Sequence, residues 1–161
     1  MSQLCALAAD TKVETPEGAM TVKGVAGKAM SVFTRDATGR TRFRQMINAR
    51  QVGEAQPMLK VTLETGATFR VGPDQIVYKK GMAEVRAAEL HVGDDLEAAH
   101  HYPDGYDYHD LNTGERRIST HAWRVTKIEP AGQADVFSMA VNKTGNFFLA
   151  AGVLCKAEGA A

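Results

Sequence analysis

The sequence predicts an all-β fold because apolar residues alternate with polar ones and because turn-forming residues punctuate these runs. Leu59, Val61 and Leu63 alternate with Lys, Thr and Glu, which is the period-2 pattern of a half-buried strand. Thr65-Gly66 then predicts a tight turn into a second strand over 67–71. Many short strands at such close spacing indicate a sandwich or barrel-like β fold.

The remaining elements follow from the same two signals. Strands over 30–34 and 41–49 are expected on either side of Asp36-Ala37-Thr38-Gly39, a run of turn-forming residues. Further strands are predicted over 75–78, 82–86, 124–128, 135–141 and 146–154. Only 84–90 is expected to form one or two helical turns, because little else in the chain has a 3.6-residue period.

Composition limits the class of protein and its partners. The 161 residues predict a single domain over 1–161, long enough to bury roughly 70% of its unfolded surface. Nineteen basic residues balance nineteen acidic ones, which argues against a nucleic-acid partner. No apolar run reaches the about 18 residues that a membrane span needs, so no membrane partner is expected.

The cellular location is predicted from the first residues and the cysteines. Met-Ser-Gln-Leu-Cys lacks the basic and apolar regions of a signal peptide. The two cysteines do not make a disulfide scaffold, so a reducing compartment is expected. The sequence therefore predicts a cytoplasmic protein.

The two ends of the chain resemble the terminal motifs of the Hint (hedgehog/intein) domain, a self-processing module. At the start the resemblance rests on 6–13, followed by Thr15-Pro16-Glu17-Gly18, and at the finish on 146–154. The internal segments 61–75, 85–94 and 135–154 are similar to the intervening intein blocks, in the same order, so the resemblance covers most of the chain.

The resemblance implies a horseshoe of two β subdomains related by a pseudo-twofold axis, with the termini brought together. A weak internal repeat agrees with it, since 25–30 can be laid over 91–96. Each copy places a hydrophobic residue before a Gly and then leads into an apolar strand position. The alternative is coincidence, because short β proteins often use Gly before strands.

The family's N-terminal chemistry begins with a Cys or Ser that attacks the carbonyl just before it. The resemblance places that nucleophile four residues before the Asp of Asp10-Thr11, and this position holds Ala6. Cys5 lies one residue further out and reaches the site only through a one-residue bulge. The alternative for Cys5 is a plain buried or terminal thiol.

The family's acid is the His of a Thr-x-x-His motif, and Gly72 and Gln75 stand at the Thr and His positions. Gln75 can orient a peptide by hydrogen bonding but is not a proton donor, unlike imidazole. Asp74 can titrate, although the turn formed by Pro73 and Asp74 gives it a purely structural explanation.

The C-terminal positions depart from the family pattern as well. The family ends in His-Asn, where the Asn cyclises to cut the chain, and this sequence has Lys156 and Ala157 there. Ser138 stands where an Asp or Cys is expected, and Gly145 where a His is expected. The strand and turn residues persist while these positions change together, which natural divergence explains better than an engineered Cys-to-Ala replacement at Ala6.

Two functional hypotheses follow. The first is an intein-like, autoprocessing-type domain with impaired chemistry, capable at most of single-turnover self-cleavage. In it Cys5 attacks the Leu4 carbonyl, Asp10 and Thr11 shape the site, and Asp74 and Gln75 polarise the scissile amide. The second is a non-catalytic structural or interaction module on a Hint scaffold. The expected partner is the flanking host polypeptide or another protein.

Two further segments carry side chains that could form binding sites. Residues 98–120 are expected to form an exposed loop insertion. Within it 100–110 is rich in metal-capable side chains, but its Pro, Gly and Asp content favours a loop, so no metal or other cofactor is expected. The arginines at 40, 42 and 44, with Arg50 and Arg70, could contact phosphates, while a solvated sheet face is the commoner explanation.

A geometric expectation concerns the two cysteines. If both ends reach one junction, the Cα atoms of Cys5 and Cys155 should lie within or close to disulfide reach, about 4.4–6.8 Å. The alternative is two unrelated thiols.

Overall fold

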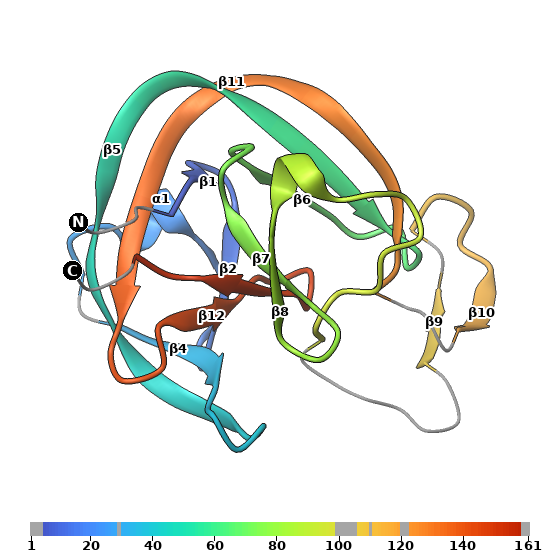
Figure 1. The fold of residues 1–161 in the computed structure, drawn as a ribbon, viewed down its shortest axis with the longest axis horizontal. Helices are drawn as coiled ribbons and strands as arrows, with labels where there is room; N and C mark the ends of the chain where they lie inside the picture. Colours follow the sequence, from blue (N-terminus) through green and yellow to red (C-terminus); the bar gives the residue numbers. More distant parts are fainter. Residues whose placement is uncertain (1–4, 29, 99–105, 110, 120–122, 159–161) are drawn as a thin grey trace.

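A computed structural model describes residues 5–28, 30–98, 106–109, 111–119 and 123–158, and strands dominate it (Figure 1). The prediction of an all-β fold is confirmed. Among the described residues, the helical elements are single turns, and no helix is long and apolar enough to span a membrane.

Two long antiparallel strands form the frame of the molecule. β5 (Thr41–Leu63) and β11 (Val125–Val141) pair along most of their length and arch over the other elements (Figure 1). Each joins two strands that the sequence predicts separately, 41–49 with 59–63 and 124–128 with 135–141. Bulges in the β5–β11 register absorb the stretches where the alternation of apolar and polar residues fails.

The first half of the chain contributes a hairpin, a helical turn and a strand. In order these are β2 (Lys12–Thr15), β3 (Gly18–Thr21), α1 (Val22–Val25) and β4 (Met30–Arg35). The Thr21 hydroxyl caps α1 by accepting from the Gly24 amide at 3.1 Å. The turn was not predicted, because four residues are too few to show a helical period.

The second half repeats this order. β7 (Ile76–Lys79) and β8 (Ala83–Arg86) form a hairpin, the 3-10 turn η1 (Ala87–Glu89) follows, and Asp95 and Leu96 make isolated bridges. In the predicted repeat, Gly27 and Gly93 occupy equivalent positions and have φ of 77° and 100°. The structure therefore supports the repeat and the pseudo-twofold arrangement.

Both ends of the chain are built into the sheets. β1 (Leu7–Ala8) lies between β11 and β6 (Thr68–Val71), while β13 (Leu154–Lys156) lies between β12 (Asn146–Phe148) and β7. The predicted strand 146–154 is thus two strands joined by a turn. One buried cluster containing Leu7, Val13, Met139, Phe147 and Leu149 connects the ends to both halves.

The described part of 98–120 includes a hairpin of β9 (Tyr106–His109) and β10 (Arg116–Ser119), which stands at one side of the molecule (Figure 1). Residues 99–105, 110 and 120 lie outside the described residues, so most of the segment considered as a metal-binding loop does too. Elsewhere in the described chain, no group of three or more His, Cys, Asp or Glu is placed to hold a metal ion.

Candidate functional site

The Gln75 side chain links the two ends of the chain. It is 1% exposed, and its Oε1 accepts from the Ala6 amide at 2.6 Å. Its Nε2 donates to the Lys156 carbonyl at 2.9 Å and to the Ile76 carbonyl at 2.8 Å. A primary amide carries one acceptor oxygen and two N–H donors, so this side chain uses both of its donors and its acceptor at the junction.

Ala6 and Gly72 pack against each other beside Gln75. The Gly72 amide donates to the Ala6 carbonyl at 2.7 Å. A Cβ placed on Gly72 would lie 2.8 Å from the Ala6 Cβ, closer than van der Waals contact allows. The Thr that the family pattern puts at position 72 therefore fits only if the chain around Ala6 moves.

The Cys5 side chain faces β11 from a buried position. Its Sγ lies 3.2 Å from the Ser138 Oγ and accepts from the Met139 amide at 3.1 Å. Its own amide donates to the Ser138 Oγ at 3.0 Å. Burial raises the pKa of the Cys5 thiol, while its hydrogen bonds with Ser138 and Met139 oppose that shift. The thiolate is therefore scarce at neutral pH.

Gln75 contacts the amide of Ala6, not that of Cys5, and β1 pairs with β11 in continuous register at Leu7 and Ala8. The peptide bond that Gln75 addresses is thus Cys5–Ala6. The Leu4 carbonyl, expected to be attacked by Cys5, lies outside the described residues.

A chain of polar groups continues from Ser138 to the surface. The Ser138 hydroxyl donates to the Glu158 carboxylate at 3.1 Å, and Glu158 forms an ion pair with Arg50 at 2.8 Å. Sequence reasoning did not identify Glu158, since a partner 108 residues away from Arg50 leaves no local pattern.

Lys156 and Ala157, which stand where the family pattern has His and Asn, form ion-pair and hydrogen-bond contacts within the fold. The Lys156 ammonium pairs with Glu84 at 2.9 Å, and its carbonyl accepts from Gln75. Ala157 is buried, and its amide donates to the Gly145 carbonyl at 2.9 Å. Gly145 has φ of 68°, a left-handed backbone conformation that glycine adopts without steric cost.

Asp10 and Thr11 contact β6. The Thr11 hydroxyl donates to the Arg70 carbonyl at 2.5 Å, and Asp10 forms an ion pair with the Arg70 guanidinium at 3.0 Å. The Asp10 side chain is 66% exposed. These two residues therefore fix β6, the strand next to β1.

Asp74 points away from the junction. It pairs with Arg86, and its side chain is 75% exposed. The Asp74 carboxylate raises the pKa of the Arg86 guanidinium through its hydrogen bond. This placement does not match the expectation that Asp74 polarises the same amide as Gln75. It agrees with the alternative, in which Asp74 is an exposed turn residue.

Cys5 and Cys155 are both free thiols and both belong to the main buried cluster. Burial raises the pKa of Cys155, and a charge on Cys5 would raise it further. The two thiols thus share one environment, while disulfide reach between their Cα atoms stays a prediction.

Three of the five arginines considered as phosphate contacts form ion pairs with acidic residues. Arg42 pairs with Asp36, Arg50 with Glu158 and Arg70 with Asp10. These pairs agree with the solvated-face explanation.

Comparison with solved structures identifies the fold. The chain is similar to the Ssp DnaB mini-intein variant M86, with 12% identity, a TM-score of 0.78, and coverage of 99% of this chain and 98% of that one. A DnaB intein from Synechocystis sp. PCC 6803 matches with 11% identity, a TM-score of 0.74 and coverage of 95% and 98%. A bacterial intein-like domain from Clostridium thermocellum matches with 18% identity, a TM-score of 0.68 and coverage of 94% and 97%.

No family model and no curated protein matches the sequence. The fold is nevertheless the Hint/intein-like fold that the motifs predict.

Proposed function

We propose that this chain is an intein-like, autoprocessing-type domain whose cleavage chemistry is impaired and whose junction now acts as a structural clip. The observation that carries the proposal is the Gln75 amide, which binds the Ala6 amide on one side and the Lys156 carbonyl on the other. The clip holds together the two ends that an active relative would cut and rejoin.

The chemistry of the junction supports impairment at each step. Acyl transfer at the N-terminal side needs a nucleophile and a proton donor for the leaving amide. The Ala6 methyl group supplies no nucleophile, and the neutral Gln75 amide supplies no usable proton. At the C-terminal side, Ala157 has no side-chain amide that could cyclise.

Cys5 gives a second candidate, single-turnover cleavage at the N-terminal side. Its thiol lies beside Ser138, which in turn is hydrogen-bonded to Glu158. Burial argues against this candidate, because it raises the pKa of the thiol and the thiolate is the reactive form.

The proposed role is that of a structural or interaction module that connects flanking polypeptide segments. Because the ends converge on one clip, sequences attached to them emerge from one region of the domain. The partners are therefore the host polypeptide or a protein bound to it.

Intact-mass measurement tests the proposal. The chain is expressed between two carrier proteins of different mass and incubated with and without dithiothreitol at neutral pH. We expect one unbroken polypeptide in both conditions. A break at Leu4–Cys5 or Cys5–Ala6 would overturn the proposal.

Matched variants identify the origin of any break. A thiol-dependent break that persists in Cys155→Ala and disappears in Cys5→Ala would establish Cys5 as a nucleophile and replace the clip with a single-turnover self-cleaving site.

A further inference from the structure

A cavity of about 610 Å³ lies apart from the junction. Aromatic rings of Phe33, Trp123 and Phe148 line it, and Glu14 and His109 supply polar groups. None of Cys5, Ala6, Gln75 or Lys156 lines it. Its size lies within the about 300–1,000 Å³ of small-molecule sites, which combine an apolar wall with a few polar groups.

Two close approaches to glycine shape the walls of this cavity. A Cβ on Gly152 would lie 2.4 Å from the Trp123 Nε1, and a Cβ on Gly66 would lie 3.0 Å from the Leu111 Cβ. Both glycines have positive φ, 93° and 89°. The indole and the Leu111 side chain therefore reach their positions only because the opposing residues have no side chains.

The charge of the cavity favours a cation. Glu14 is the only carboxylate among the described lining residues, and neither Lys nor Arg lines the cavity with it. The Glu14 side chain makes no hydrogen bond or ion pair with any other described residue. Arg35 lies 5.2 Å from the centre of the Phe148 ring, but its guanidinium is paired with the buried Glu97.

We propose that this cavity binds a small aromatic ammonium compound. The aromatic body would pack against the half-buried rings of Phe33 and Trp123, and the ammonium would pair with the Glu14 carboxylate. This inference is independent of the proposed function of the junction, since the two sites share no named residue.

Trp123 makes the proposal directly measurable, because it is the single tryptophan of the chain and lines the cavity. Its fluorescence is followed while the protein is titrated with 2-phenylethylammonium, 2-phenylethanol or phenylacetate, three probes of similar size and different charge. We expect saturable binding of the ammonium compound with a Kd of roughly 1 mM, as befits a fragment. We expect the alcohol to bind about five-fold more weakly and the carboxylate to bind weakest.

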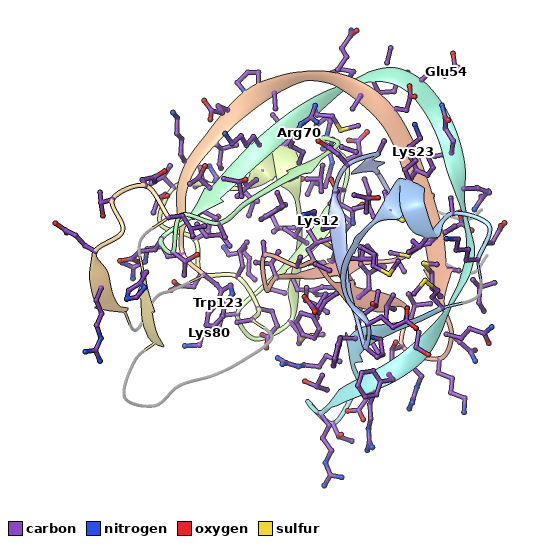
Figure 2. All side chains as sticks on the ribbon, turned by 180° about the vertical axis from the view of Figure 1, so that it is seen from behind. Lys12, Lys23, Glu54, Arg70, Lys80 and Trp123 are labelled. Carbon is purple, nitrogen blue, oxygen red and sulfur yellow. The ribbon has the colours of Figure 1, made fainter. Side chains whose placement is uncertain are left out.

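Charge-neutral variants isolate the role of Glu14. In Glu14→Gln the Kd of the ammonium compound should come to within about two-fold of the Kd of the alcohol. In Glu54→Gln the about five-fold preference for the ammonium compound should remain. Figure 2 shows Glu54 on the outer arch at the upper right and Trp123 in the lower left part of the molecule, so Glu54 is a matched control away from the cavity.

A wild-type measurement keeps the proposal testable even if Glu14→Gln fails to fold. Raising the salt concentration should reduce the preference for the ammonium compound over the alcohol. No saturable change in fluorescence, equal binding of all three probes, or a preference unaffected by Glu14→Gln would each overturn the proposal.

Discussion

Replacing Gln75 by Ala should destabilise the whole domain, because one buried side chain holds both ends of the chain. The substitution removes three hydrogen bonds and leaves the Ala6 amide, the Lys156 carbonyl and the Ile76 carbonyl without this partner. Each buried polar group that loses its partner costs about 1–3 kcal/mol. Water entering the space would offset part of this, so we expect a loss of about 3 kcal/mol, a large fraction of the about 5–15 kcal/mol typical of a domain.

Urea unfolding measures this loss. With a typical slope of about 1.5 kcal/mol per molar urea, the midpoint should fall by about 2 M. Gln51→Ala is the matched control, since Gln51 is exposed and makes one hydrogen bond of 3.2 Å to the Gly53 carbonyl; its cost should be below about 0.5 kcal/mol.

Hydrogen exchange at the Ala6 amide separates the clip from a general loss of packing. We expect that amide to lose protection in Gln75→Ala even under conditions where the protein stays folded. A loss of unfolding free energy in Gln75→Ala below about 1 kcal/mol, or equal to the loss in Gln51→Ala, would refute the role of Gln75 as a clip. Unchanged protection of the Ala6 amide would refute it as well.

Three further predictions concern other buried residues. Gly72→Thr should lower the free energy of unfolding by about 1–3 kcal/mol because of its contact with Ala6, and Ala6→Gly in the same chain should restore part of the loss, as measured in urea. Cys5 and Cys155 should react with iodoacetamide at pH 8 at least about 100-fold more slowly in the folded protein than in denaturant, since burial raises the pKa of both thiols; equal rates would contradict this. Burial raises the pKa of Tyr78 from 10.0 to about 12, so the unfolded chain binds fewer protons across that window and the free energy of unfolding should fall as pH rises from about 10 to 12. Tyr78→Phe should flatten this part of the pH profile.

The sequence was most informative where a local pattern determines the structure. The alternation around Leu59–Leu63 and the turn at Thr65-Gly66 led to the hairpin of β5 and β6. The lengths of β5 and β11 were not predicted, because bulges continue the pairing through Gly53 and Pro57, where strand patterns are weak. Glu158 was not identified for another reason: it meets Ser138 and Arg50 only after the chain has folded.

The contacts at the junction also bear on the proposed function, because they oppose single substitutions toward the family pattern. A Thr at position 72 would collide with Ala6. A His in place of Gln75 has only two ring nitrogens, so it cannot reproduce all three hydrogen bonds that Gln75 makes. Positions 72 and 75 are thus constrained by their neighbours, so the contacts that join the two ends of the chain oppose the Thr and His of the family pattern there.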